Sequence, residues 1–438
     1  MGSEMCIRDS FAIILAISGA IYLFNPQYQS VLESSIHSRG TTIEQDATQL
    51  SAERVVEAAL SQHPSTRLRR LTLPRSDEDR SYEVELITSE GSRIVWVDQY
   101  SGDILHDVLK SDRLMEIVKD IHEGLLVGNK GSYVVELMAS WMIVLIITGF
   151  YLWWPRGRSL ASFFIPRLSG QSNREKLKQI HGVGGAWVGG MVLLLLLSGL
   201  PWTQLWGAGF ERVTKQLGWD APAQEWVITL ESNDPHAEHK EHSLSLQEGV
   251  SDNATQATLQ SMPVAQDAVP ISITTIVATA RDLELGSPIE IQPPAGKNGV
   301  WTIKSMMQNR PKRTTVHLDR WTGEEIMRIG FKDRHAVQQL TGYGIALHEG
   351  ALFGWFNQLL GLVAALGVVA LSITGTWMWW RRRPKGAIGM PSMPEDKRIR
   401  TSVILLIAGL ALFLPMVLIS LIAALIIDVT WSKLKPAH

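Results

Sequence analysis

Apolar residues are concentrated in five blocks, at residues 11–24, 133–154, 183–206, 356–380 and 402–427. A helix needs about 20 apolar residues to cross a hydrocarbon core of about 30 Å. Four blocks reach this length, and the first is short on its N-terminal side. The pattern therefore predicts a multi-pass α-helical membrane protein with about five transmembrane helices.

The two long polar gaps, about 25–120 and 207–345, carry patterns of their own. In the first gap, LSAERVVEAALSQHP has apolar residues at helical spacing, and YEVELI and SRIVWVD alternate as strands do. In the second gap, ISITTIVATARDLEL and WTIKSM have the same roles. We therefore predict two inserted, water-facing α+β domains, each with one helix and an antiparallel sheet, related by internal duplication.

These patterns divide the chain into segments. MGSEMCIRDS is charged and stops abruptly at Phe11 inside an apolar run, which suggests a non-native N-terminus; a short cytoplasmic tail is the alternative. The predicted segments are a non-native start at 1–10, a truncated first span at 11–24, the first α+β domain at 25–120, a second span at 121–154, a basic loop at 155–180, a third span at 181–206, the second α+β domain at 207–345, a fourth span at 346–380, a basic loop at 381–400, a fifth span at 401–427 and a tail at 428–438.

One stretch of the chain occurs twice without a gap. IHEGLLVGNKG, which contains His122, matches LHEGALFGWFN, which contains His348, and the following apolar runs end in TGFYLWWPR and TGTWMWWRR. The hairpins VDQYSGDIL and LDRWTGEEI also match, and we interpret their Asp98 and Asp319 as structural turn residues. The repeat places one histidine of each copy at the same depth.

Ser-Gly or Thr-Gly pairs lie late in four apolar blocks, with the glycines at Gly19, Gly149, Gly199 and Gly375. Small residues allow membrane helices to pack closely. They also leave room for a flat cofactor, and both interpretations can hold together.

A further histidine, His181, precedes Gly199 by 18 residues. The same spacing from Gly19 falls on position 1, so the four positions would form two pairs, one near each membrane face. Two neutral imidazoles on facing helices can ligate a b-type haem, which predicts His122, His348 and His181 as ligands. The alternative is that each histidine is an interfacial or hydrogen-bonded residue.

The length of the second helix constrains this picture. A continuous helix from His122 to Gly149 would be about 40 Å long, which exceeds the bilayer core. Either both outer histidines lie at or above the outer surface, or the helix breaks at Gly128 or Gly131.

Other polar residues could support a site. Glu123 and Glu349 follow the paired histidines and could orient the imidazoles as hydrogen-bond partners, or face water. His236, His239 and His242 recur every third residue and could hold a transition metal, or be solvated in a polar linker.

Charge and cysteine content narrow the possibilities. Basic residues crowd the loops after the second and fourth blocks, which places these loops and the N-terminus in the cytoplasm and both α+β domains outside. Cys6 is the only cysteine, which excludes a disulfide framework, an iron–sulfur cluster and a CxxCH haem attachment.

Taken together, the His-Glu-Gly motifs, the Thr-Gly-x-x-x-Trp-Trp helix ends, the Asp-x-x-[Ser/Thr]-Gly hairpins and HGVGG after His181 resemble the PepSY-associated transmembrane helix family over about residues 11–427. The resemblance implies periplasmic PepSY domains, the bacterial inner membrane, and kinship with iron-regulated ferric-siderophore reductases that carry two haems. The first helix of that family usually opens with a histidine, which this chain lacks, so an inner haem b is in question.

We therefore expect haem-dependent electron transfer to an extracytoplasmic ferric siderophore or other ferric chelate, serving iron uptake. No G-x-G-x-x-G fingerprint follows a strand, so a cytoplasmic or quinol donor must supply the electrons. The alternatives are a non-enzymatic PepSY module that binds a protease or envelope partner, and a haem subunit that reduces a protein partner. Membrane lipid is expected as a partner and nucleic acid is not, and a homodimer is left open.

Overall fold

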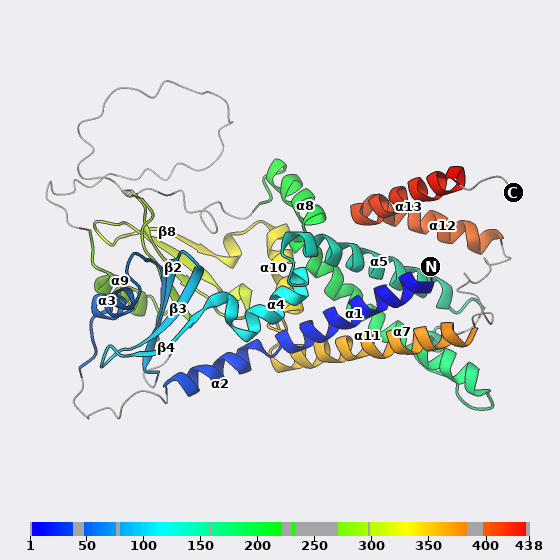
Figure 1. The fold of residues 1–438 in the computed structure, drawn as a ribbon, viewed down its shortest axis with the longest axis horizontal. Coiled ribbons are helices and arrows are strands. Elements are labelled where there is room, and N and C mark those ends of the chain that lie inside the picture. The colour runs from blue at the N-terminus through cyan, green and yellow to red at the C-terminus, as the bar shows by residue number, and fades with distance from the viewer. Residues whose placement is uncertain are drawn as a thin grey trace, which may run out of the picture.

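A computed structural model describes residues 2–37, 48–75, 79–157, 159–220, 230, 232, 270–296, 298–382 and 397–434. A β-sheet with two covering helices lies at one end of the molecule, and a bundle of long helices extends from it (Figure 1). The bundle and its flanking helices are α1 (Gly2–Tyr22), α2 (Asn25–His37), α4 (Leu114–Gly124), α5 (Asn129–Trp153), α6 (Ala161–Phe164), α7 (Asn173–Gly199), α8 (Leu205–Gln216), α10 (Ala336–His348), α11 (Trp355–Arg382), α12 (Lys397–Phe413) and α13 (Pro415–Leu434).

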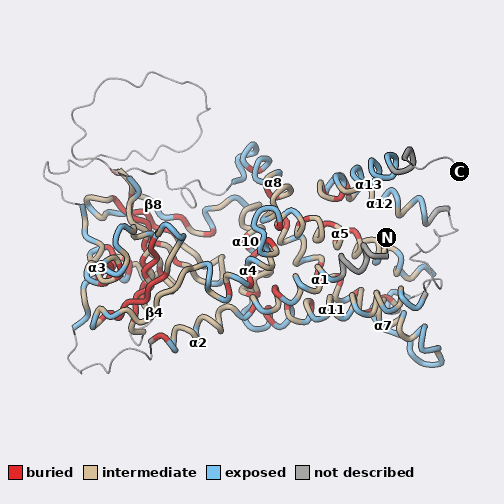
Figure 2. Tube along the Cα trace, in the orientation of Figure 1, coloured by how far each residue is buried: buried red, intermediate tan, exposed pale blue. Residues whose placement is uncertain are grey.

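Three helices, α5, α7 and α11, are long and apolar enough to cross a membrane. If each of two bent helix pairs is counted as one span, the number of spans rises to five. Only 6% to 22% of the most apolar stretch of each long helix is buried inside the protein. Figure 2 shows the same contrast, because buried residues concentrate in the sheet. Apolar helices with so little internal burial need a lipid environment.

The two bent pairs differ from straight spans. Helices α1 and α2 meet at 49°, and α2 continues toward the sheet. The segment predicted as a span at 401–427 consists of two helices, α12 and α13, bent by 118°, and passes as a span only when the two helices are taken together. The break falls at Pro415, where a proline cannot donate the backbone hydrogen bond that a continuous helix needs.

The extramembrane part is one eight-stranded antiparallel sheet in the order β4-β3-β2-β1-β5-β6-β7-β8. In the sequence, one helix precedes the four strands of each half of the sheet. The first half comprises α3 (Ala52–Gln62), β1 (Arg67–Thr72), β2 (Ser81–Thr88), β3 (Gly91–Asp98) and β4 (Ile104–Leu109). The second half comprises α9 (Ile273–Asp282), β5 (Ile289–Gln292), β6 (Trp301–Ser305), β7 (Thr314–Leu318) and β8 (Glu325–Gly330).

The two halves join through β1 and β5, where Leu71 pairs with Ile291 and Thr72 with Glu290. The sequence predicts one helix and an antiparallel sheet in each half, and the structure has this element order in both. It does not keep the halves as separate units, because their first strands pair edge to edge. This pairing satisfies the backbone groups of two strand edges that would otherwise be exposed.

The sheet has an apolar face and a face that carries most of the charged residues beside a small apolar cluster of Ile36, Ile94 and Trp96, as the alternation in YEVELI predicts for its strand. Val84, Leu86 and Ile291 are fully buried in a core with α3 and α9, which cover the face away from the bundle. The other face carries charged residues, among them Arg70 and Glu85. The charged face therefore lies on the side of the membrane helices.

The repeated hairpin aspartates are turn residues. Asp98 Oδ1 accepts the backbone N–H of Tyr100 at 2.8 Å, and Asp319 Oδ1 accepts that of Trp321 at 2.8 Å. These bonds close the turn between neighbouring strands in each half, which agrees with the structural interpretation of both residues.

A buried carboxylate in the bundle fixes the start of α8. Glu136 of α5 is fully buried, and its two oxygens accept the backbone N–H groups of Leu205 at 2.8 Å and Trp206 at 2.9 Å. The first N–H groups of a helix have no partner within the helix. The side chain of Glu136 therefore supplies the cap that α8 lacks locally.

We expect Glu136→Gln to destabilise the attachment of α8. The amide oxygen can accept one N–H, but the amide nitrogen would face the other, which leaves a buried donor unpaired at a cost of about 1–3 kcal/mol. Thermal unfolding and limited proteolysis in detergent measure the effect. The exposed Glu211→Gln on α8 is the matched control, and equal behaviour of the two variants would contradict the capping role.

Candidate functional site

The repeated histidines lie on two short helices between the sheet and the bundle (Figure 1). His122 lies in the last turn of α4, and His348 is the last residue of α10. A turn then leads into the long helices α5 and α11. Gly128 and Gly354 occupy matching positions in these turns, with φ of 59° and 62°, which glycine adopts without strain. The helix break that the length argument offered as an alternative therefore lies at residues 125–128.

The two imidazoles lie next to each other. Their ring centroids are 6.2 Å apart, and the ring planes are inclined by 70°. Two metal–imidazole bonds of about 2 Å each, together with the radii of the two rings, span about 6 Å. The separation of His122 and His348 therefore matches the length that two imidazoles holding one metal ion would need.

Hydrogen bonds define the tautomer of both rings. His122 Nδ1 lies 2.9 Å from the carbonyl oxygen of Leu15, and His348 Nδ1 lies 2.9 Å from that of Leu195. A carbonyl oxygen only accepts, so Nδ1 carries the proton and donates it in each case. The lone pair of a neutral ring is then on Nε2, the arrangement found in metal-ligating histidines.

His181 has the same arrangement near the other end of the bundle. Its Nδ1 lies 3.0 Å from Thr374 Oγ1, and that hydroxyl donates to the carbonyl of Ala370 at 2.8 Å. The hydroxyl proton is thus committed, so Nδ1 of His181 is the donor to Thr374. Ser198, which contacts His348, lies 17 positions after His181 on α7. This spacing corresponds to about 25 Å.

The glycines of the Ser/Thr-Gly pairs, except Gly149, lie against these histidine rings. A Cβ added to Gly19 would lie 2.9 Å from Cε1 of His122, and one on Gly199 would lie 3.4 Å from Cε1 of His348. Gly375 has the same 3.4 Å relation to His181. No described residue lies within 4 Å of a Cβ on Gly149. The small residues thus make room for imidazoles, a contact that helix packing alone does not predict.

The two glutamates next to the histidines are placed differently from the prediction. Glu349 forms an ion pair with Arg310 at 2.7 Å, and the Arg310 guanidinium lies 5.5 Å from the ring centre of Trp202. Glu123 lies one turn after Lys119 on α4. Backbone carbonyls, not these carboxylates, accept from the Nδ1 atoms. Glu349 instead links the histidine-bearing turn to the second half of the sheet domain, through a residue that no sequence motif marked.

The proposed metal tract lies outside the described part of the chain, since His236, His239 and His242 fall within 233–269. Within the described ranges, no group of three or more His, Cys, Asp or Glu side chains could hold a metal ion. The two-imidazole arrangement is therefore the candidate site that the structure builds.

Membrane-length helices and an antiparallel sheet domain together define a membrane protein with an extramembrane α+β part. The family model described as the PepSY-associated TM region matches residues 10–382, and the chain belongs to this family. Among proteins with curated functions, none matches the chain.

Proposed function

We propose that the protein binds a b-type haem between His122 and His348 and carries electrons across the bacterial inner membrane to a ferric chelate. The observation that carries the proposal is the neighbouring pair of imidazoles, 6.2 Å apart between ring centroids. Both rings are fixed by Nδ1 bonds that leave Nε2 for the metal. A bound haem would supply an iron that alternates between the ferric and ferrous states.

The proposed orientation places the sheet domain in the periplasm. Helix α5 ends and α7 begins at the end of the bundle away from the sheet, so the basic loop between them is on that side (Figure 1). Basic loops favour the cytoplasmic side, which supports this orientation. The outer histidine pair then lies next to the periplasmic domain, where a ferric chelate would arrive.

A second haem near the cytoplasmic face would use His181 as one ligand. The Nδ1 bond to Thr374 prepares the ring in the same way as in the outer pair. Among the described residues, no second imidazole lies near His181. In this scheme a cytoplasmic or quinol donor gives up one electron at a time, and each electron converts one ferric chelate to ferrous iron and free chelator.

Removing either outer histidine should remove the haem. For the protein purified in mild detergent, we expect a b-type band in reduced-minus-oxidised spectra. His122→Ala and His348→Ala should each lose at least one haem per polypeptide, since both imidazoles would be needed to hold it. Haem content by pyridine haemochrome is the measurement, and His63→Ala, outside the bundle on a hydrogen bond to Asp107, is the control.

Two results would count against this function. A colourless wild-type protein would leave the family's extramembrane domain as a binding module for a protein partner. A haem protein whose reduced form is not reoxidised faster by added ferric chelate would instead pass its electrons to another acceptor. Stopped-flow reoxidation against chelate concentration separates these cases.

A further inference from the structure

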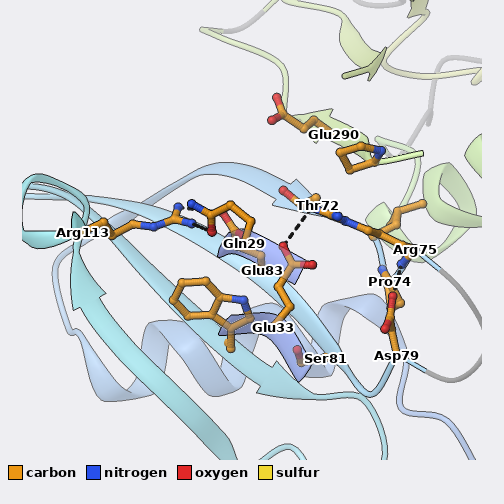
Figure 3. Close-up of a pocket in the computed structure, with 13 residues that line it drawn as sticks. Gln29, Glu33, Thr72, Pro74, Arg75, Asp79, Ser81, Glu83, Arg113 and Glu290 are labelled. Carbon is orange, nitrogen blue, oxygen red and sulfur yellow. Dashed lines mark hydrogen bonds and ion pairs between the residues drawn. The ribbon is translucent and has the colours of Figure 1, made fainter. Parts of the chain in front are cut away.

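A cavity of about 160 Å³ lies on the charged face of the sheet, next to α2 (Figure 3). A single water molecule needs about 10–15 Å³ measured in the same way, so the cavity can hold a ligand the size of a side chain. Its charged lining consists of Glu33, Arg75, Asp79, Glu83, Arg113 and Glu290. Four carboxylates against two guanidinium groups give the lining an excess of negative charge.

Most of these charges already have close partners. Arg75 Nη2 donates to Glu33 at 2.8 Å, and Glu290 accepts from Arg70 at 2.6 Å. Glu83 differs, because its ion pair among the described residues is with Arg113 at 3.9 Å, beyond hydrogen-bond distance. Burial raises the pKa of Glu83, and Arg113 offsets this effect only partly. Among the described residues, Glu83 therefore has an ion pair but no cation within hydrogen-bond distance.

A second group in the cavity, the hydroxyl of Ser81, has no hydrogen-bond partner among the described residues. Ser81 is 5% exposed, lines the cavity, and its hydroxyl makes no hydrogen bond within the described structure. Ser81 and Glu83 are two positions apart on β2, so both side chains project from the same face of the sheet. An unsatisfied buried hydroxyl costs about 1–3 kcal/mol, which a suitable ligand would recover.

We propose that this cavity binds an organic cation through a primary ammonium or guanidinium group, with Glu83 as its charge partner and Ser81 as a hydrogen-bond acceptor. The excess of carboxylates selects a cation over an anion. An ammonium or guanidinium group is a donor only, which matches the two acceptors offered by the site. The same group occurs on free amines and on Lys or Arg side chains of peptides, and both are sources to be tested.

Isothermal titration of the full-length protein in detergent tests the proposal. Agmatine and cadaverine represent free amines, acetyl-Gly-Arg-Gly-amide and acetyl-Gly-Lys-Gly-amide represent side chains, and 1-pentanol is the uncharged control ligand. We expect saturable binding of at least one cation and none of the alcohol. The pair of probes that binds more tightly identifies the source.

Two variants test the assigned residues. Glu83→Gln should weaken binding at least tenfold, because the charge is lost while the shape is kept, and Ser81→Ala should weaken it several-fold. Glu57→Gln, an exposed residue on α3, is the charge-matched control and should bind as the wild type does. Unchanged affinity in Glu83→Gln, or no saturable binding of any probe at millimolar concentration, would overturn the proposal. If Glu83→Gln does not fold, wild-type affinity in Ser81→Ala overturns it.

Discussion

Arg70→Met is expected to lower the free energy of unfolding of the sheet domain by about 3 kcal/mol at neutral pH. Arg70 donates through Nε and Nη2 to Glu85 and through Nη1 to Glu290, so it connects the two halves of the sheet. The side chain of Glu85 is 2% exposed. Removing the cation leaves this carboxylate buried, although Lys110 and Arg69 stay within 4 Å, which places the cost at the lower end for a broken buried pair.

The same variant should change how stability depends on pH. Burial acts to raise the pKa of Glu85, but Arg70, together with Lys110 and Arg69, holds the pKa below the ordinary 4.5. In the wild type, Glu85 therefore contributes stability above pH 4.5 that is lost as pH falls through its lowered pKa. Without Arg70, burial dominates and raises the pKa, so protonation then favours the folded state. The stability difference between the two proteins should shrink on acidification.

Thermal unfolding in detergent, followed by the circular dichroism of the sheet at about pH 7 and about pH 4.5, measures both effects. Arg67→Met on the same strand is the control, because Arg67 is exposed and should change stability by less than about 0.5 kcal/mol. A constant difference between Arg70→Met and the wild type at both pH values would contradict the assigned role of Glu85.

The histidine pair is the part of the candidate site that the sequence predicts most directly. A repeat without gaps must place His122 and His348 at equivalent positions of two equivalent units, and a two-fold arrangement of such units brings them together. The structure places their rings in contact distance. The sequence could not predict the hydrogen-bond partner of each imidazole, because the carbonyl oxygens of Leu15 and Leu195 are backbone atoms that any residue would offer.

The joined sheet was not predictable from the strand patterns. Period-2 alternation identifies strands and their buried face, but it says nothing about which edges pair across 200 residues of intervening chain. Strands β1 and β5 are both first strands of their halves, and their exposed edges are equivalent by the repeat. The pairing follows from tertiary packing, with Arg70 and Glu290 joining the halves on the charged face.

Glu136 and Arg310 show a second limit of prediction from the sequence. An acidic residue inside an apolar block is a sequence signal for a specific role, because an unpaired charge in lipid is costly, and Glu136 carried that signal. Its partners are backbone N–H groups about 70 residues away, which no side-chain motif records. The role of Arg310 likewise becomes apparent only from its ion pair with Glu349.

The glycine substitutions give the sharpest test of how the histidines are seated. We expect Gly19→Ala to weaken haem binding roughly tenfold to a hundredfold, because its Cβ would lie 2.9 Å from the His122 ring and overpacking costs about 1–3 kcal/mol. The ring cannot simply turn away, since its Nδ1 is bonded to Leu15. Gly199→Ala, with 3.4 Å to His348, should have a smaller effect of the same sign.

Gly149→Ala is the matched control, because it lies in an equivalent Thr-Gly pair whose described surroundings leave its Cβ position open. Alanine is a better helix former than glycine by about 1 kcal/mol, so this variant should keep its haem and melt at the same or a higher temperature. Gly19→Ala should melt lower even without haem, since the clash with His122 exceeds the helical gain. The opposite changes in melting temperature would show that Gly19 makes room for the His122 imidazole. If both glycines served only general helix packing, the two variants would respond alike.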